Sequence, residues 1–437
     1  MQSQAVAPAA AGTEARRDGA GTARRVPTRV VAATVAGNAL EFYDFVTYAF
    51  FAVYIGQAFF PASTPFMSLL LSVGVFGVGF VFRPLGGVLI GAYADRAGRR
   101  PAMLLTIVMI TVGTIGLALT PSYASIGIAA PLIVVFCRLV QGLALGGEVG
   151  PATAFLIEIA PPGRRAFYGS WQLASQGIAA LSAGAVGTVL SLLLDHDDLV
   201  AWGWRVPFLL CLALVPVAIF LRRAMPETLE HGQAQAAPSG QLRRHAGLIG
   251  MAVLLILGGT VATYVGNYMT TYAIATLHFP PSIALAATVM GGAGTLVFSL
   301  LGGWLADRYG RRPVMLVPRI ILAVIAVPLF LLLTSHPSMA TLFAATVTIT
   351  GLTSASSTAA LVVVPELLPA SIRATGMAIG YAVGVSLFGG TTQFVITWLI
   401  EATGDPTSPA WYVTLTSLVT AVAMWTLPES RGRVLEG

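Results

Sequence analysis

Five ionisable residues fall inside long apolar stretches in the first half of the sequence: Glu41, Asp44, Arg83, Arg138 and Glu148. A charged side chain at the centre of a bilayer costs about 2.5–3.5 kcal/mol on insertion scales, so such charges mark functional sites by default. An acid beside an arginine can bind and release a proton, because the arginine favours its ionised form while apolar surroundings favour its neutral form. The residue types therefore predict ion coupling.

Helical spacing indicates which of these charges meet. Glu41 and Asp44 share one helical face with Tyr48, and Arg138 precedes Glu148 on a separate apolar segment. Because buried charges are tolerated as opposite pairs, we expect Asp44 to face Arg138. Protonation of Asp44 would weaken this pair and release Arg138. A fixed electrostatic contact between helices is the alternative, and the predicted proton-coupling residues are Asp44, Glu41, Arg138 and Glu148.

Amides, hydroxyls and arginines form polar stripes on several of the apolar segments. Buried polar groups in lipid need hydrogen-bond partners, and a water-filled cavity that holds a polar ligand supplies them. The alternative is that these side chains bond neighbouring helices to each other, and that Arg83 only anchors its helix. The predicted substrate-binding residues are Arg83, Arg138, Gln141, Tyr48, Gln172, Gln176, Tyr264 and Asn267, with Tyr381 and Gln393 as further candidates.

The second half of the sequence offers fewer deep charges. Arg319 and Glu366 are expected near the cytoplasmic ends of their segments. This asymmetry predicts that ion coupling resides in the first half.

The composition indicates lipid as the main solvent of the chain. Apolar residues make up 56% of the 437 residues and charged residues 10%, against about 25% charged in soluble domains. The net charge of +6 is explained by arginines in loops and not by nucleic-acid binding. Cys137 and Cys211 lie in apolar segments and the histidines are scattered, so we predict neither a disulfide nor a metal site.

Membrane-spanning helices must position these residues. Runs of about 20 apolar residues, long enough to cross a hydrocarbon core of about 30 Å, recur along the chain. We predict an all-α membrane protein with twelve transmembrane helices in two pseudo-symmetric bundles of six. The bundles cover 31–222 and 247–428, joined by a cytoplasmic linker 223–246 and flanked by a disordered tail 1–30 and a tail 429–437. The spans are 31–55, 66–92, 102–120, 125–157, 166–194, 204–222, 247–276, 283–306, 314–334, 339–365, 372–400 and 409–428.

Arginines in the connecting segments predict the orientation. They gather in alternate connections, which share a side with the linker and with both chain ends, whereas the opposite connections hold Arg205 alone. Because positively charged loops stay inside, both termini are expected in the cytoplasm.

A charged motif occurs twice. GAYADRAGRRP at residues 91–101 returns as GWLADRYGRRP at residues 303–313. Glu158 with Arg164 has a looser echo in Glu366 with Arg373, and the order of these landmarks indicates duplication. The repeated motif resembles the signature loop of the major facilitator superfamily. That resemblance implies that both copies lock the two halves on the cytoplasmic side, through the gating residues Asp95, Arg96, Arg99, Arg100, Asp307, Arg308, Arg311 and Arg312.

Narrower motifs resemble one family within that superfamily. GNALEFYDF at 37–45, FRPLGG at 82–87 and RLVQGLALGGE at 138–148 are similar to the metabolite:H⁺ symporters, which carry citrate, α-ketoglutarate, shikimate, and proline or betaine. SWQLASQ at 170–176, WGWRVPF at 202–208, TGD at 403–405 and SPAW at 408–411 look most like citrate and tricarballylate carriers. The proton-coupled sugar carriers of the superfamily place an Asp and an Arg as Asp44 and Arg138 stand here.

The resemblance implies a secondary transporter of the bacterial inner membrane. We expect import of a carboxylate, citrate or a related tricarboxylate, together with H⁺ by alternating access. The alternatives are another organic acid, or a zwitterion such as betaine. The sequence shows no cluster of a nucleophile, a base or metal ligands that would indicate an enzyme. We therefore expect no catalytic residue and no cofactor, with the proton as the coupling ion. The expected partners are the carboxylate, the proton and membrane lipid, with the chain acting as a monomer.

Overall fold

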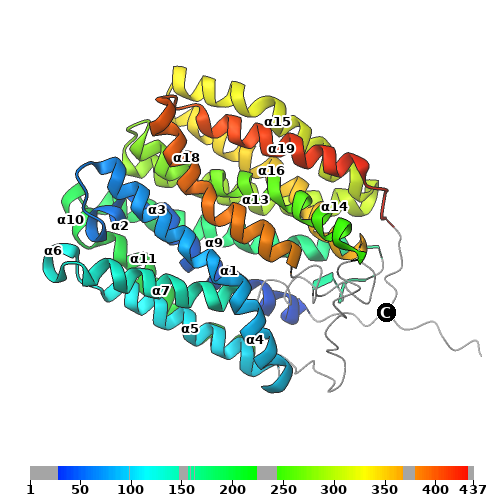
Figure 1. Ribbon diagram of the computed structural model, residues 1–437, viewed down its shortest axis with the longest axis horizontal. Helices are drawn as coiled ribbons and strands as arrows, with labels where there is room; N and C mark the ends of the chain where they lie inside the picture. Colours follow the sequence, from blue (N-terminus) through cyan, green and yellow to red (C-terminus); the bar gives the residue numbers. More distant parts are fainter. Residues whose placement is uncertain are drawn as a thin grey trace, which may run out of the picture.

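A computed structural model describes residues 28–97, 99–146, 156–157, 159–161, 163–223, 244–367 and 379–431. The described residues form helices and no strand. The helices separate into two groups, blue to green for the first half and green to red for the second, which lie against each other along their length (Figure 1). The predicted N-terminal tail, most of the linker and the end of the C-terminal tail lie outside the described residues.

The first half supplies six spans, some of them in two pieces. The first span continues through a turn at Phe51, and the second breaks at Phe82, directly before Arg83 and Pro84. Proline removes a backbone donor and clashes with the preceding turn, which explains a break at this position. The spans are α1 (Thr28–Phe50) with α2 (Ala52–Phe59), α3 (Pro65–Val81) with α4 (Arg83–Ala97), α5 (Arg99–Leu119), α7 (Ala129–Gly146), α9 (Arg165–Leu193) and α11 (Val206–Arg223); α6 (Tyr123–Ile126), α10 (His196–Ala201) and η1 (Gly203–Arg205) are short connecting helices.

The second half repeats this arrangement. Its fifth span contains a π-helical stretch at the level of the central packing, and π-helical turns often accompany functional sites. The spans are α13 (Ala246–Ala275), α14 (Pro281–Tyr309), α15 (Arg311–Ser335), α16 (Met339–Leu367), the helical residues 379–383 with η2 (Gly384–Gly389) and α18 (Gly390–Thr403), and α19 (Ser408–Thr426).

The predicted fold class is confirmed: the protein is an all-α membrane protein of twelve spans. In the part of the chain that is described, eight helices are long and apolar enough to cross a membrane. The helices α1, α5, α11 and α19 complete the set. The fourth span begins at Ala129 and not at the expected residue 125, because the short helix α6 and a turn at Gly127 precede it. Its expected end at 157 cannot be compared, since residues 147–155 lie outside the described residues.

The ends of the bundles are chemically distinct. Helix α1 begins and α19 ends toward the right of the view, where α4 also meets α5 (Figure 1). The connections α4–α5 and α14–α15 carry the repeated charged motif, so we call this the arginine-rich end.

The two bundles contact each other most closely through α9 and α14. A Cβ atom on Gly177 of α9 would lie 2.5 Å from the backbone nitrogen of Leu296, and one on Gly292 of α14 would lie 2.4 Å from that of Leu181. Only glycine permits such close backbone contact. These helices therefore meet along their middle with no side chain between them.

Within the first bundle, α7 packs on α3 and α4 backbone to backbone. A Cβ atom on Gly142 would lie 1.9 Å from the carbonyl oxygen of Gly79, and one on Gly86 would lie 2.0 Å from that of Leu143. This packing fixes where α4 starts, and so fixes the depth of Arg83.

We expect Gly142→Val to destabilise the protein. The added side chain would force α7 away from α3, and overpacking of this kind costs about 1–3 kcal/mol. Thermal unfolding of the detergent-solubilised protein, followed by loss of the monodisperse chromatographic peak, should occur several degrees lower. Gly250→Val is the matched control, since a Cβ atom on Gly250 meets nothing within 4 Å; an equal loss of stability in both variants would contradict this account of the packing.

Candidate functional site

Asp44 lies in the interior of the first bundle, where three helices converge. Its carboxylate accepts hydrogen bonds from the Thr114 hydroxyl of α5, at 2.7 Å, and from the Gln141 amide of α7, at 2.8 Å. The nearest guanidinium nitrogen of Arg138 lies 3.9 Å away. The predicted pairing of Asp44 with Arg138 is thus confirmed, and two neutral donors share the carboxylate with it.

Arg138 contacts an aromatic ring as well as the acid. Its guanidinium carbon lies 3.8 Å from the centre of the Tyr48 ring, and the Tyr48 hydroxyl donates to the carbonyl oxygen of Ser72. Two of its nitrogens, Nε and Nη2, have no hydrogen-bond partner among the described residues. Loss of the Asp44 charge would leave the buried guanidinium of Arg138 with unsatisfied donors. Because unsatisfied buried donors cost free energy, this loss would favour movement of the Arg138 side chain.

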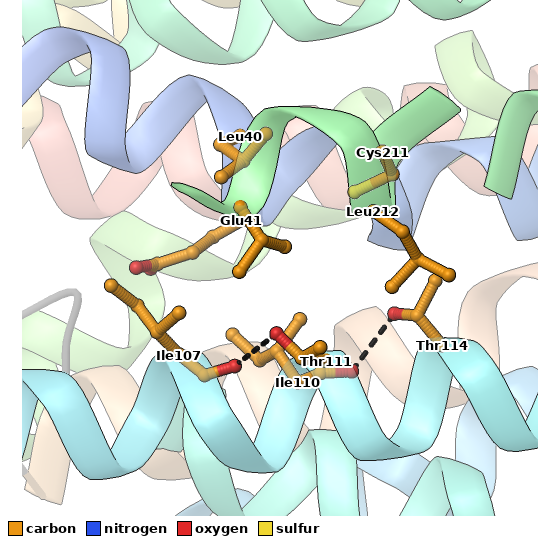
Figure 2. A pocket seen from close by; sticks show the side chains of 9 residues that line it. Leu40, Glu41, Ile107, Ile110, Thr111, Thr114, Cys211 and Leu212 are labelled. Atoms are coloured by element: carbon orange, nitrogen blue, oxygen red, sulfur yellow. Dashed lines mark hydrogen bonds between the residues drawn. The ribbon is translucent and has the colours of Figure 1, made fainter. Parts of the chain in front are cut away.

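Glu41 occupies a neighbouring compartment of the same bundle. It lines a narrow internal pocket between α1, α5 and α11, together with Thr111, Thr114 and Cys211. Figure 2 shows Glu41 extending toward α5 near Ile107, with Thr114 at the other end of the pocket. Thr114, which holds Asp44, therefore connects the two acids through one small space.

Gln172 is engaged within the bundle. Its amide donates to the Asn38 side-chain oxygen at 3.0 Å, while the Asn38 amide donates to Ser175 and to the backbone oxygen of Gln172. This network ties α1 to α9. The observed contacts of Gln172 bond one helix to another, which is the alternative to a contact with substrate. A contact between Gln172 and the substrate stays a prediction.

A cavity of about 90 Å³ lies between the bundles. Residues from both halves line it, among them Phe42, Gln176, Gly259, Tyr264, Ser357 and Tyr381. Ligand pockets usually measure roughly 300–1,000 Å³, so this cavity must widen to admit a polar metabolite. Of the predicted substrate-binding residues, the structure brings Gln176 and Tyr264 to this cavity, with Tyr381 beside them.

Arg83 of the first bundle lies next to a residue of this cavity, although it is not itself part of the lining. Its guanidinium interacts with the Tyr264 side chain of the second bundle, which lines the cavity, and stacks on Phe80, 3.8 Å from the ring centre, and on Phe45, 4.7 Å from it. Tyr381 lies close enough to interact with it electrostatically. Arg83 is therefore a buried cation at the boundary between the two halves, in a position to meet an anion in the cavity.

The remaining candidates lie elsewhere. Asn267 is half-buried on α13, and Gln393 is buried with no partner for its side-chain amide among the described residues. Arg138 and Gln141 contact Asp44, and Tyr48 contacts Arg138; none of the three is part of the lining of the central cavity. Their role in substrate binding stays a prediction.

The expected asymmetry of deep charges is wrong in one respect. Arg319 of α15 is fully buried, with 0% of its surface exposed. It follows Arg311 by about two helical turns and turns inward, where it donates to the backbone oxygen of Gly258 at 2.9 Å. The second bundle thus holds a buried cation. The position of Arg319 in the sequence, close to the arginine-rich end, does not predict this burial.

Asp307 links the two bundles at the arginine-rich end. Its carboxylate accepts hydrogen bonds from the backbone N–H groups of Ala166, at 3.0 Å, and Phe167, at 2.9 Å, in the first turn of α9. A helix N-terminus carries a partial positive charge and free donors, which a carboxylate satisfies. A residue of the second half therefore caps a helix of the first, as a lock between halves requires.

Acids around Arg311 extend this contact. Arg311 pairs with Asp307 at 3.1 Å and with Glu366 at 3.6 Å, and Glu429 accepts from the backbone N–H groups of Arg311 and Arg312. Burial acts to raise the pKa of Glu429, but these backbone donors outweigh it and hold the pKa below its usual range. The stabilisation from Glu429 is therefore complete above the ordinary carboxyl pKa and is lost as the pH falls through the lowered one.

The other predicted gating residues differ in the contacts they make. Arg308 stacks loosely on the rings of Trp304 and Tyr309, at 5.4 and 5.6 Å, and Arg312 donates to the backbone oxygen of Trp425. The other predicted residues lie outside the residues or side chains that the structure describes, so their roles stay predictions. They are Glu148, Asp95, Arg96, Arg99 and Arg100.

We expect Asp307→Asn to open the arginine-rich end. A helix-terminal charge contributes about 0.3–2 kcal/mol, which corresponds to a shift of roughly 2–30-fold toward the open form. In a variant with Cys137 and Cys211 replaced by serine, a cysteine at Leu361 in the cavity lining should react faster with a membrane-impermeant maleimide applied from that end. Glu401→Gln, which replaces an exposed acid at the end of α18, is the control, and equal acceleration in both variants would contradict the specific role of Asp307.

Comparison with known proteins agrees with this geometry. The model of the family described as "Sugar (and other) transporter" matches residues 30–244 and 240–437. A citrate-proton symporter of Salmonella typhi is 34% identical over 91% of this chain and 94% of its own, and a proline/betaine transporter of Escherichia coli K12 is 31% identical over 94% and 85%. A crystal structure of a D-xylose-proton symporter has the same fold, with a TM-score of 0.77 at 19% identity over 93% of this chain and 99% of that one. The chain belongs to the sugar and other transporter family of the major facilitator superfamily.

Proposed function

We propose that this protein imports a carboxylate metabolite of the citrate class together with protons, across the inner membrane of a bacterium. Both termini lie in the cytoplasm in this proposal, and the proton is the only coupling ion. The observation that carries it is the presence of two buried charged sites: Arg83, which interacts with the cavity-lining residue Tyr264, and the Asp44–Arg138 pair inside the first bundle. The similarity to citrate-proton symporters supports the substrate class.

The proton acts at Asp44. From the outward-facing side a proton binds the carboxylate, which then needs neither the Gln141 amide nor Arg138. Arg138 keeps its contact with the Tyr48 ring and has free donors. Helix α7 packs against α3 and α4 at Gly142 and Gly86. A shift of α7 therefore moves the start of α4, and Arg83 with it.

The substrate anion acts at Arg83. A carboxylate in the cavity would replace the Tyr264 hydroxyl as the partner of the guanidinium and would neutralise a cation that is otherwise buried without an acid among its described contacts. With both Asp44 and Arg83 neutralised, the bundles can rock about the cavity. Release of Asp307 from the first turn of α9 then opens the arginine-rich end.

A zwitterion such as betaine is the second candidate. Four aromatic rings, Phe45, Phe76, Phe80 and Tyr264, pack together beside Arg83. Aromatic rings favour quaternary ammonium groups, and a relative of this chain is a proline/betaine transporter. In this alternative Arg83 binds the single carboxylate and the rings bind the ammonium group.

Uptake into proteoliposomes separates these candidates. Labelled citrate should accumulate when the outside is acidic relative to the lumen, and an uncoupler should abolish the accumulation. A tenfold excess of unlabelled tricarballylate should compete, and betaine should not. Uptake that ignores the pH gradient would remove proton coupling, while competition by betaine alone would favour the zwitterion.

A further inference from the structure

Arg319 is a buried cation without a charged partner among the described residues. It donates to the backbone oxygen of Gly258 at 2.9 Å and to the Ser357 hydroxyl at 3.3 Å, and its Nε atom has no partner in that part of the chain. Both acceptors are neutral. The buried acid Glu366 and the partly buried acid Asp307 of this bundle pair with Arg311 instead. A charge buried in this way is costly unless an anion reaches it.

The guanidinium stands directly behind the wall of the central cavity. Ser357, which accepts its hydrogen bond, lines that cavity, and so does Gly259. A Cβ atom built on Gly259 would lie 3.5 Å from Nη2 of Arg319 and 2.6 Å from the Ser357 hydroxyl oxygen. Gly259, which carries no side chain, and the Ser357 hydroxyl therefore form the part of the cavity wall in front of Arg319.

The two bundles each build a buried polar cluster from corresponding spans. In the first bundle, Asp44, Thr114 and Gln141 come from the first, third and fourth spans. In the second bundle, Gly258, Arg319 and Ser357 also come from the first, third and fourth spans. In the first bundle, however, the polar cluster contains its own acid, whereas the described contacts of Arg319 include none.

We propose that Arg319 is a second cationic subsite of the transport cavity and binds a carboxylate of the substrate at the part of the wall that Gly259 and Ser357 form. Arg83 binds one carboxylate from the first bundle, and Arg319 binds another from the second. This inference rests on the proposed transport of a carboxylate and sharpens it: the substrate must carry at least two carboxylates, and it bridges the halves when they close.

Binding to the purified transporter in detergent tests the proposal, with citrate, malate and lactate as probes of three, two and one carboxylates. Arg319→Gln should weaken citrate and malate binding about 10–100-fold, the range for a lost charge-assisted hydrogen bond, and should leave lactate binding unchanged. Arg319→Lys should recover part of the loss. An equal loss for all three probes would indicate a structural role for Arg319 and overturn the proposal.

A second pair of variants leaves the arginine in place. Gly259→Ala with Ser357→Ala removes the hydroxyl that the new methyl group would touch, yet places a methyl group in front of Arg319, so citrate affinity should fall as in Arg319→Gln. Ser357→Ala alone removes the hydroxyl without adding the methyl group, so its citrate affinity should stay well above that of the double variant. Citrate binding that is unchanged in the double variant would overturn the subsite while leaving the proposed function intact. A wild-type protein that binds neither citrate nor malate would overturn the proposed function itself, and the subsite with it.

Discussion

Proteoliposomes that contain Asp44→Asn should fail to accumulate citrate under any imposed pH gradient. The asparagine keeps the size of the carboxylate and can still bond Thr114 and Gln141, but it cannot bind or release a proton. For one proton per citrate and no membrane potential, a gradient of two pH units is worth about 2.7 kcal/mol, or roughly a hundredfold accumulation. In the variant, the internal concentration should only equal the external one. Counterflow exchange of labelled for unlabelled citrate should persist, because it needs no net proton movement.

Two further variants sharpen this test. Glu401→Gln replaces an exposed acid at the end of α18, remote from the buried cluster, and should accumulate citrate as the wild type does. Glu41→Gln distinguishes the two acids beside Thr114: retained accumulation in this variant would assign the proton to Asp44 alone. Wild-type accumulation by Asp44→Asn would exclude Asp44 as the coupling residue.

Arg83→Gln should raise the KM for citrate about 10–150-fold. The substitution removes a charge-assisted interaction at the cavity, and hydrogen bonds to charged groups contribute about 1.5–3 kcal/mol. It also removes the ring stacking on Phe80 and Phe45, so the folded state of the purified variant must be checked by its thermal unfolding. Initial rates of uptake over a range of citrate concentrations measure the effect.

Conservative and remote substitutions provide the controls for Arg83. Arg83→Lys keeps the charge and should recover part of the affinity, although lysine cannot bind a carboxylate in the bidentate way. Arg205→Gln removes an arginine that contacts Ala201 and Thr120, outside the lining of the central cavity, and should leave the KM unchanged. A similar rise in KM in Arg205→Gln would show that the effect is not specific to the cavity.

The contact between charged residues at the centre of the first bundle could be predicted from the sequence. Asp44 and Arg138 could be paired from the sequence, because neither is tolerable alone in an apolar helix and each lies on a defined helical face. The repeated loop likewise pointed to Asp307 as a contact between halves, and the structure gives that contact its form: a carboxylate at the first turn of α9.

Neutral donors and helix depth could not be predicted in the same way. Thr114 hydrogen-bonds Asp44 but also its own helix at Ile110, and an isolated threonine in an apolar helix normally makes only the second contact. Arg319 lies close in sequence to the arginine-rich end, and only the packing of α15 against α13 and α16 turns it inward. Gln172, a predicted ligand, meets Asn38 because the tertiary contact of α1 with α9 supplies that partner.

Proton movement caused by the substrate tests the central claim most directly. Citrate added to proteoliposomes that hold a fluorescent pH indicator, with the pH initially equal on both sides, should acidify the lumen through the wild-type protein. It should not do so through Asp44→Asn, although labelled citrate should still equilibrate across the same membranes. Citrate entry through the wild type without acidification, or equal acidification through the variant, would contradict proton coupling at Asp44.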